Sequence, residues 1–229
     1  MIRYYFNLSP NPSKVALFLE ETGLPYEPVP VDARKGEQFT PAFLALNPNG
    51  KVPAIEDDGV VVFDSNAILL YPGDKNGRFM PEERPAMRAK LLSWLMFVAT
   101  GVGPYSGQAV HFRHFAPEGN DYARTRYAFE ADRHFGILDA ELARRPYLLG
   151  EAYTIVDMAL WGWARLLPFV LGEEAWAKFP NLKRHFEGIN ARPAAQRALA
   201  LKERFAFKAE MDEEARRHMF RHAAPRTAA

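Results

Sequence analysis

Residues 51–55, with the sequence KVPAI, place a proline at the start of a predicted strand directly after a loop. Pro53 has no backbone N–H to give to a neighbouring strand, and X-Pro bonds are the peptide bonds that adopt the cis form. A cis Val52-Pro53 bond would turn the N–H and C=O of Val52 outward, where they can bind a peptide by strand-like pairing. The alternative is a trans proline that simply begins a strand, which an isolated Val-Pro pair favours.

The pair Asp64 and Ser65 lies where a predicted strand gives way to a predicted helix. Free backbone N–H groups and the positive end of the helix dipole attract a carboxylate to such a junction. The alternative is that one of the two side chains only caps its own helix. Helix capping and ligand binding can occur at the same junction, because the Ser65 amide can bind a ligand carboxylate while Asp64 faces an ammonium group of the same ligand.

The elements that must position these residues can be read from the periodicity. Residues 2–6 are typical of a strand, and the turn-rich LSPNPSK leads into VALFLEETGL, a helix with one buried side. The strand pattern YEPVPVDA contains Pro28 and Pro30, which lack the N–H of a ladder, so we expect an edge strand. After a helix around PAFLALN, the segments VPAIE and VVVFD are predicted to pair antiparallel about the turn DDG. With a helix at SNAILLY, this order predicts an α/β domain over residues 1–72.

The remainder of the chain is predicted to be helical. A linker rich in Pro, Gly and Asp follows at residues 73–84, and the periodicity is helical almost throughout from about Pro81 to Arg204. Residues 85–229 are therefore predicted to form an all-helical C-terminal domain with a basic tail. The fold class is therefore α/β plus all-α, with two domains. Pro72 is expected to end its helix early or to kink it. The basic C-terminal stretch has the composition of a mobile tail, but we expect it to pack on the rest of the chain.

Two motifs in the helical region have structural explanations. The sequence TIVD at residues 154–157 predicts a capping box in which Asp157 replaces the usual Glu or Gln, and we assign it no catalytic role. His111 and His114 have an i, i+3 spacing that can seat a metal. No third ligand is evident, so we expect structural histidines and no metal site.

The composition limits the chemistry. The chain has no cysteine, which excludes disulfides, thiolate metal sites and a cysteine nucleophile, so any sulfur must come with a ligand. With 29 Lys and Arg against 28 Asp and Glu, no bulk positive charge exists to hold nucleic acid or an anionic membrane. No apolar run approaches the ~20 residues of a membrane helix, and the first residues do not resemble a signal peptide, so we expect a cytoplasmic protein.

Five segments, in order and at the family's spacing, resemble the glutathione transferase superfamily up to about residue 200: SPNPSKVALFLEETGLPYE, VDARKGEQFTPAFLALNPNGKVPAI, DSNAILLY, GPYSGQAVHFRHFAPE and RTRYAFEADRHFGILDAEL. The likeness is to the nu class, which includes the bacterial disulfide-bond reductase type and is related to the fungal prion-forming glutathione-binding protein. The resemblance implies a thioredoxin-like N-terminal domain, a C-terminal helical bundle and glutathione as co-substrate.

The resemblance also implies roles for individual residues in binding glutathione. In the family, the γ-glutamylcysteine part is held by the positions that match Val52, Pro53, Asp64 and Ser65. Gln38 and Lys51 match positions that reach the glycine end of the ligand, and Arg126 matches an arginine that faces the ligand site. The alternatives are a solvated surface lysine at position 51 and an exposed helix charge at position 126.

Ser9 and Asn11 take the places of the family's Thr and Asn in the first loop, beside the glutathione sulfur. A hydroxyl or amide donor there stabilises a thiolate, so Ser9 is expected to donate a hydrogen bond and not to act as a nucleophile. The alternative is that SPNP is only a turn that caps the next helix, with Pro12 at its first position. Pro12 stands where the family commonly has Gly, a departure that can shift the loop holding Asn11.

The expected activity is glutathione-dependent reduction of small disulfides. Family members that reduce disulfides through a protein thiol need a cysteine in the first loop, and this chain has none. The alternatives are an S-transferase that conjugates electrophiles, a glutathione-binding regulator without catalysis, and an assembly protein that kept the fold for its dimer surface. The resemblance implies a homodimer acting on a small-molecule substrate, whose identity the sequence does not fix.

Overall fold

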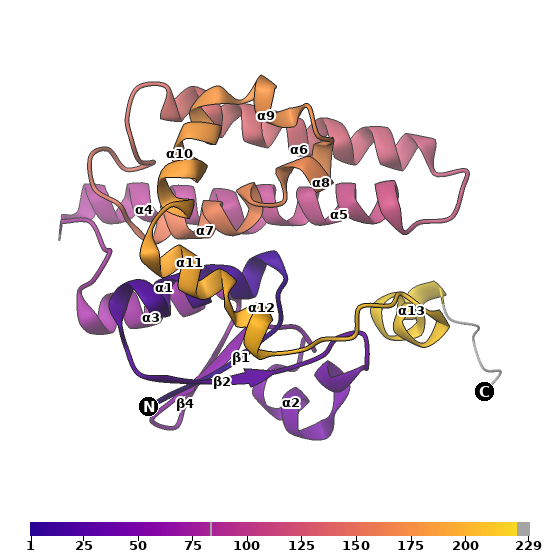
Figure 1. Ribbon diagram of the computed structural model, residues 1–229. Helices are drawn as coiled ribbons and strands as arrows, with labels where there is room; N and C mark the ends of the chain where they lie inside the picture. The colour runs from indigo at the N-terminus through magenta and orange to yellow at the C-terminus, as the bar shows by residue number, and fades with distance from the viewer. Residues whose placement is uncertain (83, 224–229) are drawn as a thin grey trace.

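The first part of the chain folds into a four-stranded sheet with helices on both of its faces (Figure 1). The computed structural model describes residues 1–82 and 84–223. The strand order is β2-β1-β3-β4, with β1 and β2 parallel and the other neighbours antiparallel. The strands are β1 (Ile2–Phe6), β2 (Tyr26–Pro30), β3 (Ala54–Asp57) and β4 (Val60–Phe63). The predicted edge position of β2 and the predicted pairing of β3 with β4 are both confirmed.

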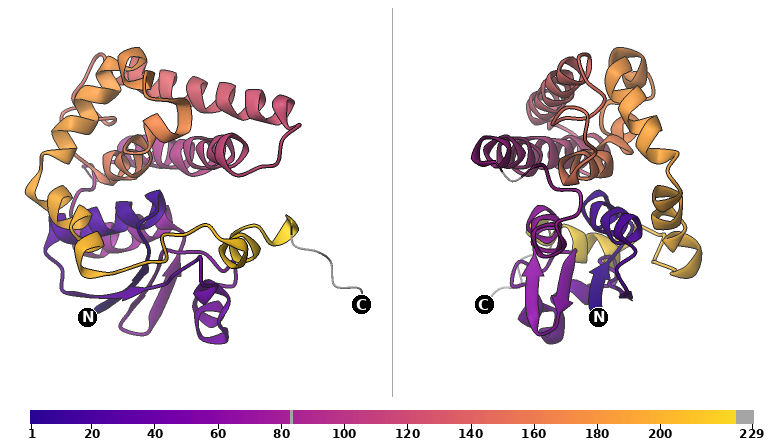
Figure 2. Two further views of the ribbon diagram at one scale, coloured as in Figure 1. Left: turned by 45° about the vertical axis from the view of Figure 1, so that its right-hand side comes forward. Right: turned by 90° about the vertical axis from the view of Figure 1, so that its left-hand side faces the viewer.

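The helices of this domain divide between the two faces of the sheet. Helices α1 (Pro10–Thr22) and α3 (Ser65–Asn76) lie between the sheet and the rest of the molecule (Figure 2). The short helices η1 (Glu37–Phe39) and α2 (Pro41–Leu46) follow the edge strand, and α2 lies on the opposite side of the sheet (Figure 1). The first-domain pattern is therefore the thioredoxin-like one expected from the sequence.

Helix α3 does not end at Pro72, so the expected early end of this helix is wrong, and the alternative, a kink at Pro72, stays a prediction. The helix continues to Asn76 and ends at Gly77, which has the left-handed φ of 63° common at helix ends. Pro72 is buried, and its carbonyl accepts a hydrogen bond from the Asn76 side chain at 2.8 Å. Packing of the buried positions Ile68, Leu69 and Pro72 offsets the backbone bond that proline cannot make. Residues 73–76, predicted to begin the linker, are therefore helical, and the domain boundary after residue 72 stays a prediction.

Beyond the linker the chain is helical, as predicted. Residues 85–223 form no strand apart from one isolated bridge between Tyr147 and Gly150. A π-helical turn, η2, joins the first two helices without a break (Figure 1). Across the described ranges 1–82 and 84–223, no helix is both long and apolar enough to cross a membrane. The elements are α4 (Pro85–Phe97), η2 (Val98–Val102), α5 (Gly103–His114), α6 (Asp121–Leu142), α7 (Ile155–Ala164), α8 (Leu167–Leu171), α9 (Ala175–Lys178), α10 (Pro180–Asn190), α11 (Pro193–Leu199) and α12 (Leu201–Arg204).

Helix α1 is buried on two sides, whereas the sequence pattern predicts a helix with one buried side. Val15 and Leu19 pack with the sheet in the core of the first domain. Leu17 and Phe18 instead belong to the core of the helical domain. Every residue from 14 to 19 is buried as a result. This helix therefore contributes side chains to both cores and lies between the sheet and α7.

The predicted capping box at the start of α7 is present and belongs to a larger buried network. Asp157 Oδ2 accepts a hydrogen bond from the Thr154 backbone N–H at 2.9 Å. The other oxygen of Asp157 accepts from the Leu148 backbone N–H at 2.9 Å and lies 3.0 Å from His185 Nε2. Asp157 is 0% exposed, so its carboxylate connects α7, α10 and the preceding loop inside the core.

The C-terminal segment, expected to pack on the rest of the chain, returns across the first domain (Figure 1). The ring of Phe205 lies 5.3 Å from that of Phe6 on β1. Phe220 lies between helix α13 (Glu213–Met219) and the short helix η3 (Arg221–Ala223), and its ring centroid is 5.0 Å from that of His111 on α5. The expectation is confirmed as far as residue 223, and residues 224–229 of the basic tail lie outside the described residues.

Candidate glutathione site

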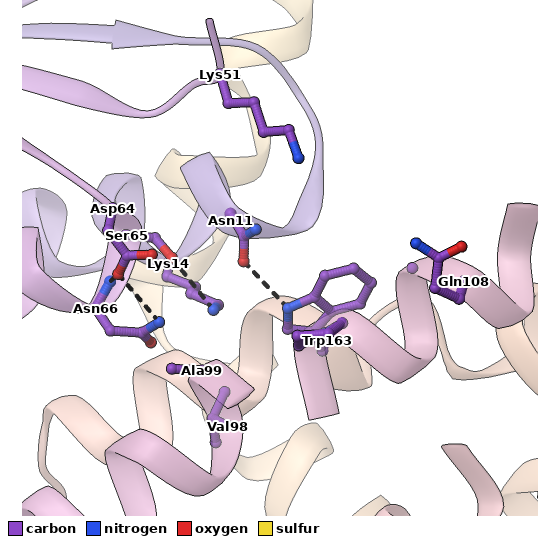
Figure 3. A pocket seen from close by; sticks show the side chains of 13 residues that line it. Asn11, Lys14, Lys51, Asp64, Ser65, Asn66, Val98, Ala99, Gln108 and Trp163 are labelled. Carbon is purple, nitrogen blue, oxygen red and sulfur yellow. Dashed lines mark hydrogen bonds between the residues drawn. The ribbon is translucent and has the colours of Figure 1, made fainter. Parts of the chain in front are cut away.

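A pocket of about 350 Å³ lies between the two domains, where α1 and the start of α3 face η2, α5 and α7 (Figure 3). A second cavity of about 190 Å³ adjoins it on the side of the cis proline and shares four of its lining residues. The shared residues are Asn11, Lys51, Asp64 and Ser65. The structure therefore brings four of the sequence-predicted site residues to one place.

Asn11 is held in one orientation by Trp163 on α7. Its Oδ1 accepts a hydrogen bond from the Trp163 indole N–H at 3.1 Å. An indole nitrogen only donates, so the partner must be the amide oxygen, and the amide nitrogen of Asn11 is left to donate elsewhere. Figure 3 shows the oxygen facing the indole and the nitrogen turned away from it. The pocket therefore contains a preset neutral hydrogen-bond donor, as thiolate stabilisation requires.

The indole itself is positioned by small residues on α5. A Cβ added to Gly103 would lie 3.2 Å from Trp163 Nε1, which is closer than most real Cβ contacts. Both Gly103 and Trp163 line the pocket. The absence of a side chain at position 103 therefore lets the indole approach α5 and still reach Asn11.

The Val52-Pro53 peptide bond is cis, which confirms that prediction. Val52 and Pro53 line the smaller cavity beside Lys51. The loop before Pro53 is held by a hydrogen bond within it, because Asn47 Nδ2 donates to the Lys51 carbonyl at 2.6 Å. Pairing of the Val52 backbone with the cysteinyl group of a ligand stays a prediction.

Asp64 caps α3, as one of the two interpretations of the Asp-Ser pair expects. Its Oδ1 accepts from the backbone N–H groups of Asn66 at 2.8 Å and Ala67 at 3.3 Å. Asp64 has a φ of 70°, a conformation that costs a residue with a side chain about 1–3 kcal/mol and that is concentrated at functional sites. Ser65, directly after it, is buried and lines the pocket.

The structure does not bring Ser9, Gln38 and Arg126 to the walls of this pocket. Ser9 is exposed, and its backbone N–H donates to the Asn7 side chain at 3.0 Å. Gln38 is buried in η1, where its Nε2 donates to the Ala33 carbonyl at 3.1 Å. Arg126 is exposed on α6 and forms an ion pair with Glu130 at 2.7 Å. Their roles in binding stay predictions from the resemblance.

Nine residues that line the pocket of about 350 Å³ were missed by the sequence analysis, and two of these, Lys14 and Trp163, bear on its chemistry. Lys14 follows Asn11 by three positions, so the two share one face of α1, and this spacing was the available signal. Trp163 lies 152 residues from Asn11, and no local pattern links the two. The other lining residues that were not predicted are Asn66, Val98, Ala99, Gly103, Pro104, Gly107 and Gln108.

Comparison with known proteins defines the class to which this fold and site belong. Residues 8–74 match the family model of the glutathione S-transferase N-terminal domain, and residues 106–193 match that of the C-terminal domain. The disulfide-bond oxidoreductase YfcG of Escherichia coli (strain K12) is 41% identical over 213 residues, covering 87% of this chain and 94% of YfcG. The chain therefore belongs to the glutathione S-transferase family.

Solved structures agree with this assignment. A glutathione transferase from Burkholderia graminis, whose structure holds two glutathione molecules per subunit, is 38% identical with a TM-score of 0.80 over 89% of each chain. A glutathione transferase from Pseudomonas putida, with one glutathione disulfide per subunit, is 35% identical with a TM-score of 0.81 over 86% of this chain and 90% of that one. Assignment to the nu class within the family stays a prediction.

Proposed function

We propose that this protein is a glutathione-dependent disulfide reductase in which bound glutathione supplies the only reacting thiol of the active site. The observation that carries the proposal is the amide of Asn11, fixed by Trp163 with its N–H₂ group as a donor at the pocket. The chain has no cysteine, so the protein itself cannot form a mixed disulfide. The relative YfcG, a disulfide-bond oxidoreductase, supports the same reaction class.

Two thiol–disulfide exchanges account for the reaction. The thiolate of one glutathione attacks a sulfur of the substrate disulfide, so that a mixed disulfide forms and the other substrate sulfur leaves as a thiolate that takes up a proton. The thiolate of a second glutathione then attacks the glutathione sulfur of the mixed disulfide, which yields glutathione disulfide and the second substrate thiol. Relatives with two glutathione molecules or one glutathione disulfide bound per subunit support a site for two glutathione units.

The protein's part in this reaction is positioning and hydrogen bonding. Asn11 donates to the attacking thiolate from the first turn of α1, and Ser9, which directly precedes this helix, is proposed as a second donor. Val52 and Pro53 align the cysteinyl part, Asp64 and Ser65 hold the amino-acid end, and Lys51 attracts the glycine carboxylate. Gln38 and Arg126 do not line either cavity, and they are proposed to contact parts of the ligand that extend beyond the two cavities.

The assay that tests this function compares two substrates of purified protein with reduced glutathione. We expect turnover of 2-hydroxyethyl disulfide and weak conjugation of 1-chloro-2,4-dinitrobenzene. Fast conjugation with no disulfide reduction would make the protein an S-transferase instead. Protection from thermal unfolding by glutathione disulfide, with neither activity, would support the non-catalytic regulator.

The protein is also proposed to act as a cytoplasmic homodimer. Apolar side chains are exposed on the edge strand β4, at Val60, Val61 and Phe63, and on the helical domain at Met96 and Phe129. Exposed apolar surface on both domains suits an arrangement in which each first domain packs against the partner's helices. A stable dimer of this kind buries about 1,200 Å² or more. Light scattering at micromolar concentration is expected to give twice the 26.0 kDa chain mass, and a single-chain mass would contradict it.

A further inference from the structure

Lys14 is a buried lysine in the wall of the candidate site. Its side chain is 1% exposed, and it lines the larger cavity with Ser65 and Asp64. Across residues 1–82 and 84–223, its amino group makes a single hydrogen bond, to Ser65 Oγ at 3.4 Å. An ammonium group has three donors and is costly to bury without partners. The protein therefore keeps, at the pocket, a buried amino group whose hydrogen-bonding capacity is mostly unused.

The fold makes room for this side chain from the opposite helix. A Cβ added to Gly162 on α7 would lie 2.5 Å from Lys14 Cγ and 2.6 Å from the Pro10 carbonyl oxygen. The aliphatic stem of Lys14 therefore passes closely against the backbone of α7, and the amino group at its end reaches Ser65 at the start of α3 (Figure 3). An apolar residue would fill the same space without an amino group, so packing alone does not explain a lysine here.

Few charged groups surround this amino group. Asp64 at the start of α3 and Lys51 from the proline loop line the same cavity, and η2 and α5 add no charged side chain to its wall. Arg165, at the end of α7, is bonded to Ser13 Oγ at 2.8 Å. Burial lowers the pKa of Lys14 to about 7, and the Asp64 carboxylate opposes this shift in part. Near neutral pH the lysine of the free protein is therefore divided between its neutral and charged forms.

We infer that Lys14 is a binding residue for the carboxylate at the amino-acid end of the ligand and takes up a proton as that carboxylate binds. The inference rests on the proposed glutathione function. The start of α3 offers the backbone N–H of Ser65 and the positive end of the helix dipole to an anion. Lys14 adds a full charge at the same point, next to the Ser65 hydroxyl. A bound carboxylate supplies hydrogen-bond acceptors that the ammonium group lacks in the free protein, and so it favours the charged form of Lys14.

Calorimetric titration of the purified protein with glutathione disulfide tests this inference. This ligand has no thiol, so thiol ionisation does not contribute to the proton balance. At pH 8, a lysine with a pKa of about 7 is roughly nine-tenths neutral in the free protein. Binding heats measured in buffers of different ionisation enthalpy are expected to show uptake of about half a proton or more per carboxylate bound at this site. The affinity should fall about fivefold to fifteenfold between pH 7 and pH 8.5.

Substitutions assign the proton to one residue. We expect Lys14→Met to abolish the proton uptake and flatten the pH dependence of affinity. Lys51→Met, which removes the other lysine of the cavity, should weaken binding but leave the uptake in place. Burial disfavours the ammonium group in the free protein, so Lys14→Met should not lower the melting temperature. Lys14→Gln, together with the buffer series on the unmodified protein, provides the same comparison if the methionine variant does not fold.

The possible outcomes separate this inference from the function. Binding of glutathione disulfide without proton uptake, or uptake that survives in Lys14→Met, overturns the role of Lys14 and leaves the disulfide reductase proposal standing. No binding of glutathione or its disulfide at any pH overturns the proposed function itself.

Discussion

Replacing Asn11 with alanine is expected to lower turnover of small disulfides by about tenfold or more, because a hydrogen bond to a charged sulfur contributes about 1.5–3 kcal/mol. The amide nitrogen of Asn11 is the donor that Trp163 leaves free at the pocket. The proposed binding through Val52 and Ser65 does not use this amide, so the dissociation constant for glutathione disulfide should change little. Steady-state rates with 2-hydroxyethyl disulfide, together with that dissociation constant, measure the two effects separately.

Two matched variants separate the donor from its orientation. Asn11→Asp keeps an oxygen that can accept from the Trp163 indole but replaces the amide donor with a carboxylate, which repels a thiolate. Its turnover should fall at least as far as that of the alanine variant. Trp163→Phe keeps the amide and removes the group that orients it, so an intermediate loss is expected. Full activity in Asn11→Asp would show that the thiolate is stabilised by another residue.

Replacing Asp157 with alanine is expected to reduce the free energy of unfolding by about 3–5 kcal/mol, the range found when one partner of a buried polar network is removed. The change leaves the backbone N–H groups of Leu148 and Thr154 without their acceptor, and His185 without its carboxylate. Each unpaired buried group adds its own desolvation penalty. Denaturant unfolding of the purified variant gives the difference, provided that the slope against denaturant is unchanged.

Asp121→Ala serves as the control for this change. Asp121 is also an acidic residue at a helix start, but its side chain is 81% exposed and, among the described residues, forms an ion pair only with Arg124 on the same helix turn. Exposed ion pairs of this kind contribute about 0–1 kcal/mol. A similar loss in both variants would mean that the acidic charge, and not the buried network, is what stabilises the helical domain.

The order of elements in both domains could be predicted because the local signals agree with the final fold. Pro28 and Pro30 predict an edge strand, and β2 is at the edge of the sheet. Thr154 and Asp157 predict a capping box, which is present. These features depend on backbone donors and acceptors within a few residues, so the sequence alone determines them.

The errors arise where contacts between distant segments decide the structure. The local rule that proline ends a helix fails at Pro72, because tertiary packing on both sides of α3 outweighs one lost backbone bond. The same limit applies to the candidate site. Asn11 could be proposed from the first loop, but the Trp163 indole that orients it comes from α7, and no periodicity relates the two positions.

Helix α1 has a further consequence for the way in which this protein unfolds. Its Val15 and Leu19 complete the core between α1 and the sheet, while Leu17 and Phe18 complete the core of the helical domain. Separating the two domains would expose one side of this helix whichever domain kept it, so neither domain has a closed core by itself. The two domains should therefore melt in a single cooperative transition, and the amide protons of α1 should exchange with solvent only through global unfolding. To replace either domain with that of a relative, the α1 side chains that pack against that domain would have to be replaced with it.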